Sequence, residues 1–168
     1  MKITISIFCL PYEIDDLENT LTQLRKASYY SDKSIDWNVD VTMCISDQMV
    51  DWNKSSINKK YFEDKFLKLS YSTDWCVKHF QTSDEILGCV SQRRFSLQRH
   101  KDADFFIWLD TDIIFEERTL SYIENAIKST RDKYPLSVIT PEIVKVWDNT
   151  WDCLVNENFL DKPLDYQK

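Results

Sequence analysis

Two aspartates separated by one residue, Asp110 and Asp112, directly follow the most apolar stretch of the sequence, Phe105 to Leu109. An uninterrupted apolar run of this length is typical of a central strand buried on both faces of a parallel sheet. Ligands of open α/β sheets gather beyond the carboxyl ends of the strands, where both acids fall. If strand geometry continues through Thr111, the two carboxylates project from the same face. Such oxygen ligands suit Mg²⁺ or Mn²⁺, which in turn can bind a diphosphate.

The Asp-x-Asp pattern has two other interpretations. One acid can cap the turn after the strand while the other is simply solvated, because Asp is common after strands. The pattern also occurs in phosphatase-like hydrolases, in which Asp110 would be the phosphorylated nucleophile and Asp112 the acid. The position of the motif after two expected strands, rather than on the first one, disfavours the hydrolase.

Charged residues elsewhere could meet this pair. Arg93 and Arg94 lie on an expected helix just before the apolar run, and Asp47 follows the second expected strand. An arginine pair is also typical of a solvated helix face. The single glycine, Gly88, excludes the glycine-rich dinucleotide and phosphate loops, which need several glycines. Two histidines and five cysteines without paired spacing make a zinc site improbable.

The order of the expected elements predicts an α/β fold. A strand over Lys2 to Leu10, an amphipathic helix over Glu13 to Ala27 and a strand over Trp37 to Ile45 form a β-α-β unit with a right-handed crossover. The remaining expected elements are a helix within Asp47 to Lys68, a short strand at either Leu69 to Ser72 or Trp75 to Phe80, a helix over Ser83 to His100, the strand Phe105 to Leu109, a helix over Thr119 to Lys128, a strand at Leu136 to Thr140 and a polar, fraying tail from Asn156 to Lys168.

Composition limits the class of protein. The 168 residues, 43% of them hydrophobic, suffice for one domain with a sizeable core. A formal net charge of -7 disfavours nucleic acid as a partner. No apolar run approaches the roughly 20 residues that span a bilayer, and the first ten residues are typical of a strand rather than a signal peptide. We therefore expect a cytoplasmic protein, with Cys9 and Cys44 as reduced core residues.

The motifs in this order resemble those of the family-2-like glycosyltransferases of the GT-A fold. The turn Cys9 to Glu13 is similar to their Pro-Tyr-Asn-like turn, and Asp47 follows the second strand as in that family. Arg93-Arg94 stands where the family has an Arg-Asn pair, and the segment Arg93 to Phe115 with its Asp-x-Asp is the closest match. The resemblance covers Lys2 to Thr140. It implies a Rossmann-related, mostly parallel sheet flanked by helices in a single domain.

The resemblance also implies a site for a UDP-, GDP- or dTDP-linked sugar, a hydroxyl acceptor such as a saccharide, and Mn²⁺ or Mg²⁺. The implied nucleotide-sugar-binding residues are Pro11, Tyr12, Asp47, Arg93, Arg94 and Asp110, and the implied metal ligands are Asp110 and Asp112. By this analogy Pro11 and Tyr12 border the nucleobase and Asp47 accepts a hydrogen bond from it. Arg94 approaches the base or phosphate, and Asp110 the ribose or metal. Tyr12 fits base stacking and a buried core position equally well.

The residues that would bind and activate the acceptor are harder to find in the sequence than those that would bind the donor. The family supplies a catalytic base after the Asp-x-Asp strand, often in a Glu-Asp pair, and no such pair follows Asp112. We assign residues 1–112 to nucleotide-sugar binding and 113–168 to a partial acceptor side, with Asp152 beside Trp151 as the candidate base. Tryptophans closing the core under solvated acids are the alternative. We expect donor binding with slow transfer or none, so a non-catalytic nucleotide-sugar-binding subunit remains an alternative function.

Overall fold

The computed structural model describes residues 1–47, 58–72, 75–83, 89–114 and 116–134. The chain divides into two compact units, Met1–Lys128 and Ser129–Lys168, and the fold below is that of the first unit. Its elements are β1 (Lys2–Cys9), the short 3-10 helix η1 (Pro11–Glu13), α1 (Ile14–Ser28), β2 (Asp36–Cys44), α2 (Lys59–Ser72), β3 (Val77–Ser83), α3 (Cys89–Arg99), β4 (Phe105–Leu109) and α4 (Thr119–Thr130), whose last two residues belong to the second unit.

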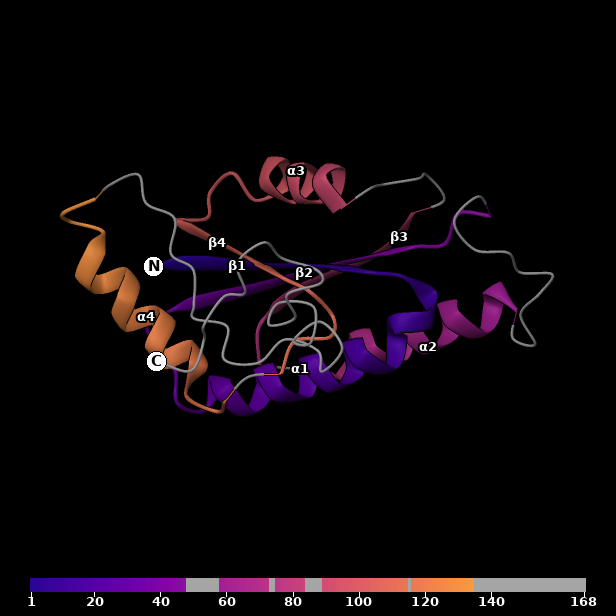
Figure 1. The fold of residues 1–168 in the computed structure, drawn as a ribbon, viewed down its shortest axis with the longest axis horizontal. Coiled ribbons are helices and arrows are strands. Elements are labelled where there is room, and N and C mark those ends of the chain that lie inside the picture. The colour runs from indigo at the N-terminus through magenta and orange to yellow at the C-terminus, as the bar shows by residue number, and fades with distance from the viewer. Residues whose placement is uncertain (48–57, 73–74, 84–88, 115, 135–168) are drawn as a thin grey trace, which may run out of the picture. The chain divides into compact units, whose positions relative to one another are not determined.

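The described strands form one parallel sheet in the order β3-β2-β1-β4, which confirms the predicted α/β class. The chain moves outward from β1 through β2 to β3 and then returns across the sheet to place β4 on the other side of β1. Right-handed crossovers therefore put α1 and α2 on one face and α3 on the opposite face, as Figure 1 shows. The order in which strands are added to the sheet therefore reverses at the boundary between β1 and β4.

The face of β1 and β2 that α1 and α2 cover is apolar, because every second residue of these two strands is apolar and most of them are aliphatic. These side chains pack against the apolar stripes of α1 and α2 and are almost fully excluded from water. The buried residues of this layer include Ile3, Ile5, Ile7, Val39, Val41, Met43, Leu17, Leu21, Leu24, Phe62 and Phe66. This layer is the main hydrophobic core, and the alternation in the sequence predicts it.

The opposite face, which α3 covers, is polar. Asp40 is fully buried there, with Arg99 Nη1 2.6 Å from its Oδ1 and His100 Nε2 3.3 Å from its Oδ2. Several other buried polar atoms of this layer have no hydrogen-bond partner among the described atoms: Thr4 Oγ1, Ser6 Oγ, Asn38 Nδ2, both side-chain polar atoms of Gln92, and Ser96 Oγ. Since an unpaired buried polar group is unfavourable, this layer stabilises the fold less than the apolar one.

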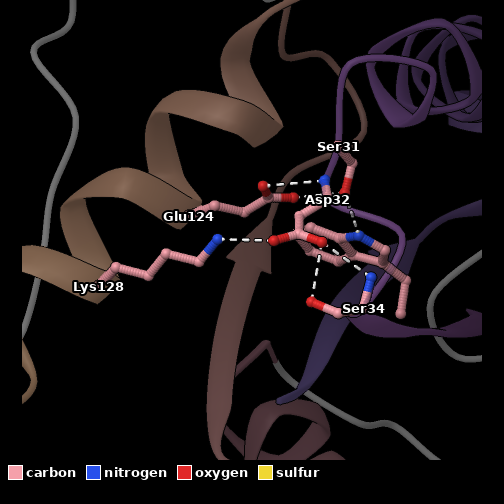
Figure 2. A network of polar contacts seen from close by, with 6 residues as sticks. Ser31, Asp32, Ser34, Glu124 and Lys128 are labelled. Atoms are coloured by element: carbon pink, nitrogen blue, oxygen red, sulfur yellow. Dashed lines mark hydrogen bonds and ion pairs between the residues drawn. The ribbon is translucent and has the colours of Figure 1, made fainter.

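A buried carboxylate joins α4 to the turn between α1 and β2. Glu124 lies on the inner side of α4, where it accepts hydrogen bonds from the Ser31 hydroxyl and, at 3.1 Å, from the backbone N–H of Asp32 (Figure 2). The Ser31 hydroxyl also accepts a bond of 2.8 Å from the Trp37 indole. These contacts satisfy the buried carboxylate and fix α4, the helix that follows the Asp-x-Asp segment, against the amino end of β2.

Asp32 adds a charged contact at the same place. Its Oδ2 lies 2.9 Å from Lys128 Nζ, and its Oδ1 accepts bonds from the backbone and hydroxyl of Ser34 (Figure 2). The bond with Lys128, and then those with Ser34, hold the pKa of Asp32 far below its usual range. The same ion pair raises the pKa of Lys128.

The strands and helices follow the predictions with three exceptions. Leu69 to Ser72 lies in α2, so the strand alternative at that position is wrong, and β3 overlaps the other one, Trp75 to Phe80. The helix predicted from Ser83 does not begin there. Ser83 instead belongs to β3, and its carbonyl accepts a hydrogen bond of 2.8 Å from the Ile45 N–H.

The third exception is β4, which was expected to be buried on both faces. It is an outer strand of the described sheet, with β1 as its partner, and all five of its residues are at least partly exposed. The predictions for Leu136 to Thr140 and for the tail from Asn156 fall outside the described residues. None of the helices described here has the length and apolar character needed to cross a membrane.

The polar layer generates a prediction about stability. Ser96→Ala should leave the free energy of unfolding unchanged or raise it by up to about 1 kcal/mol, because it removes a buried hydroxyl that has no partner among the residues placed by the structure. Ser28→Ala, which removes an exposed hydroxyl bonded to its own helix, is the matched control and should have little effect. Urea denaturation measures both. A loss of more than about 1 kcal/mol in Ser96→Ala would contradict the description of this layer as poorly satisfied.

The ion pair in Figure 2 predicts a pH dependence. A carboxyl with a lowered pKa in the folded state stabilises the fold above its unfolded pKa, and this contribution is lost as pH falls through the folded value. Lys128, whose pKa is raised, contributes below its usual pKa and loses that contribution as pH rises past the raised one. Asp32→Asn, which can still accept the Ser34 bonds, should therefore melt below wild type at pH 7 by a difference that shrinks below about pH 4. An equal difference at pH 7 and pH 2.5 would refute the charge argument.

Candidate functional site

The carboxyl ends of β1 and β4 lie side by side. The two strands are parallel neighbours with Ile7 opposite Leu109, and the residues that follow them are η1 and the segment Asp110 to Asp112. The strand order reverses at this boundary, which is where open α/β sheets bind ligands. The structure therefore confirms that both aspartates follow the carboxyl end of a strand, and it brings the turn containing Tyr12 to the adjacent strand end.

Asp110 lies in contact with α3. Its side chain is 66% exposed, and its Oδ1 is 3.4 Å from Nη2 of Arg93. The Arg93 guanidinium also lies over the ring of Trp108, with its central carbon 6.0 Å from the ring centroid. Of the residues predicted for the site, Arg93 and Asp110 are thus brought into direct contact.

Strand geometry ends before Asp110, since β4 stops at Leu109 and Thr111 and Asp112 form a turn. The condition under which both carboxylates would share a strand face is therefore not met, and their approach depends on the turn. Thr111 is buried, and its carbonyl accepts a hydrogen bond of 2.6 Å from the hydroxyl of Thr20 on α1. Asp112 is exposed. The turn is thus held to α1 on one side and to α3 through Asp110 on the other.

The turn after β1 presents Tyr12 to solvent. Pro11 is buried, while Tyr12 is 68% exposed, so the alternative of a core tyrosine is wrong. The turn is closed by Glu13, whose Oε2 accepts a bond of 2.8 Å from the Leu10 N–H and whose own N–H donates to the Leu10 carbonyl at 2.9 Å. Partial desolvation, and then the charge of Glu13, raise the pKa of Tyr12. The ring is therefore a neutral aromatic surface at physiological pH.

The other predicted residues are less informative. Arg94 is exposed on α3 beside Arg93, and Asp47 is exposed three residues after the end of β2. Asp47 thus follows the carboxyl end of β2, Arg94 lies in the middle of α3, and the roles of both residues remain predictions. Asp152, the candidate base, lies outside the described residues.

Sequence analysis missed two residues that matter here. Thr20 lies on the apolar stripe of α1 and is buried, and a threonine at a core-facing helix position is the signal that could have indicated a tertiary hydrogen bond. Trp108 belongs to a strand predicted to be buried, but the residue is 45% exposed and its ring lies under the Arg93 guanidinium.

The carboxylates near the end of β4 determine what kind of metal site this region could form. No group of three or more His, Cys, Asp or Glu residues that could hold a metal occurs among the residues placed by the structure. Asp110 and Asp112 offer at most two carboxylates, and Mg²⁺ is often held by one or two carboxylates together with water and substrate phosphates. These residues therefore fit a cation that binds together with a diphosphate better than one held by the protein alone.

Comparison with models of known protein families, with curated proteins and with solved structures finds no match to this chain. The functional argument therefore depends on the geometry described above.

The buried bond between α1 and the turn is open to a test. Thr20→Val keeps the shape of the side chain but leaves the Thr111 carbonyl without its donor, so the free energy of unfolding should fall by about 1–2 kcal/mol. Thr22→Val is the control, because the Thr22 hydroxyl is exposed and bonds to the Glu18 carbonyl of the same helix. Chemical denaturation of both variants gives the comparison. Equal losses would mean that the Thr20 bond has no special role in holding the turn.

Proposed function

We propose that this chain binds a nucleoside-diphosphate sugar, together with Mn²⁺ or Mg²⁺, beyond the carboxyl ends of β1 and β4. In this proposal it is a metal-dependent glycosyltransferase or the donor-binding part of one. The observation that carries the proposal is the adjacency of two features at the reversal of strand order: the turn with exposed Tyr12 and the Asp-x-Asp segment. The resemblance to GT-A glycosyltransferases adds the same order of motifs along the chain.

Each feature of the site matches one part of such a donor. Tyr12 offers an exposed aromatic face on which a nucleobase can stack. Arg93 offers a guanidinium fork suited to phosphate oxygens, and Asp110 and Asp112 offer carboxylates to the cation. Base, diphosphate and metal would then occupy neighbouring positions along the strand ends.

Transfer of the sugar requires stabilisation of the negative charge that develops on the leaving diphosphate. When bound, the cation would act as a Lewis acid that stabilises the negative charge developing on the leaving diphosphate. Arg93 would add a charge-assisted contact to the same group. Transfer also needs a base that takes the proton of the acceptor hydroxyl, a contribution of roughly 10²- to 10⁴-fold in rate. The proposed base, Asp152, is outside the described residues, so the described site accounts for donor binding rather than for acceptor activation.

This division leaves a non-catalytic nucleotide-sugar-binding subunit as the second candidate. What favours it is that every role proposed above for a described residue concerns the donor, and that the proposed base lies outside the described residues. Incubation with nucleotide sugars and saccharide acceptors separates the two candidates by the release of nucleoside diphosphate. Acceptor-dependent release indicates a transferase, and donor binding without release indicates a binding subunit.

Asp112→Asn tests the metal assignment. It removes one anionic ligand while keeping the shape, so it should weaken Mn²⁺-dependent binding of a nucleoside diphosphate at least about 10-fold, the loss expected for a charge-assisted contact. The melting temperature should change little because Asp112 is exposed. Isothermal titration with UDP, GDP and dTDP, with and without Mn²⁺, measures the affinities.

Glu116→Gln is the matched control, since it removes an exposed negative charge four residues further along the chain and should preserve binding. Equal affinity of Asp112→Asn and wild type would refute the metal assignment. Failure of the wild-type chain to bind any of the three nucleotides with Mn²⁺ would refute the proposed function.

A further inference from the structure

Arg93 connects α3 to the end of β4 through two contacts. Its Nη2 lies 3.4 Å from Asp110 Oδ1, and its guanidinium lies over the Trp108 ring. Trp108 is paired with Ser6 of β1, whose side chain belongs to the face of the sheet covered by α3. The arginine therefore approaches the aspartate from this face and is supported by the indole.

The two contacts differ in what a ligand would do to them. A divalent cation on Asp110 would compete directly with the guanidinium for the same carboxylate. The Trp108 face, in contrast, does not coordinate metals and would remain available to the arginine by a cation–π contact. When a cation takes the place of Arg93 on Asp110, the guanidinium would thus stay on the Trp108 ring, and the N–H group that had bonded to Asp110 could bind another acceptor.

We propose that Arg93 is an exchangeable counterion, which neutralises Asp110 in the absence of donor and transfers to the donor diphosphate when a cation binds Asp110. This inference rests on the proposed function. Breaking the Arg93–Asp110 ion pair costs little free energy. Both side chains are exposed, Arg93 to 39% and Asp110 to 66%, and exposed ion pairs contribute little to stability. The guanidinium gains by the exchange, since its fork can make two parallel hydrogen bonds to phosphate oxygens.

The exchange predicts opposite effects of one substitution on two ligands. Arg93→Ala removes the guanidinium that competes for Asp110, so Mn²⁺ alone should bind more tightly. The diphosphate loses a charged partner, so the nucleotide should bind more weakly. A residue that only maintains the fold would change both affinities in the same direction, and a residue that only binds phosphate would leave the metal affinity unchanged.

The test uses the full chain at low ionic strength. Free Mn²⁺, followed by electron paramagnetic resonance, gives the affinity for the metal alone, and isothermal titration gives the affinity for UDP or GDP at saturating Mn²⁺. We expect Arg93→Ala to bind Mn²⁺ alone about 2- to 5-fold more tightly than wild type, the range of an exposed ion pair. Its nucleotide affinity should fall at least about 10-fold.

Two further variants complete the design. Gln98→Ala changes an exposed residue of the same helix and should match wild type in both measurements. Arg93→Lys keeps the charge but not the fork, so it should bind Mn²⁺ like wild type and the nucleotide with intermediate affinity.

The other possible results of these titrations show whether the exchange or the proposed function is wrong. If wild type binds the nucleotide but Arg93→Ala changes both affinities in the same direction, or leaves the Mn²⁺ affinity unchanged, the exchange is wrong and the proposed function stands. If wild type binds Mn²⁺ but no nucleotide, the proposed function fails and the exchange fails with it.

Discussion

The reversal of strand order between β1 and β4 is the constraint on which the rest of the structure depends. Because all four described strands are parallel, their carboxyl ends share one edge, and at this boundary the helix that follows β1 (α1) and the helix that precedes β4 (α3) lie on opposite faces. The turn with Tyr12 and the Asp-x-Asp segment are neighbours for this reason alone. The bond from Thr20 and the ion pair with Arg93 then hold the second segment from the two faces of the sheet. The proposed donor site is the consequence of topology refined by these two contacts.

The two faces of the sheet have different roles. The apolar layer under α1 and α2 excludes water almost completely and supplies most of the stabilisation through burial of aliphatic side chains. The layer under α3 contains a buried aspartate and several polar atoms that have no partner in the described part of the chain, and an unsatisfied buried polar group costs about 1–3 kcal/mol. The helix that carries Arg93 thus packs on the less favourable face. The arginine reaches the site from this polar layer, while the turn after β4 is anchored to the well-packed one.

The sequence predicted the parts of the fold that depend on periodicity. Alternating residues in β1 specify a strand with one apolar face, and the spacing of leucines specifies α1. Local sequence patterns did not predict the features that depend on contacts between residues far apart in the chain. An apolar run such as β4 does not reveal how many strands flank it, so it does not predict the outer position of β4 in the described sheet. Tyr12 beside a proline suits either core or surface, and only the structure shows that Pro11 is the buried residue and Tyr12 the exposed one. The bond between Thr20 and Thr111 joins residues far apart in the chain, which no local pattern indicates.

The central claim is that a nucleoside diphosphate and a divalent cation bind together at the adjoining ends of β1 and β4. Amide chemical shifts of the ¹⁵N-labelled chain, followed by NMR during titration with UDP or GDP and Mg²⁺, test it most directly. The account predicts that the signals of Tyr12, Arg93, Asp110 and Asp112 shift together, and much more with both ligands than with either alone. Shifts centred instead on the surface between α1 and α2, or no shifts with both ligands present, would contradict it.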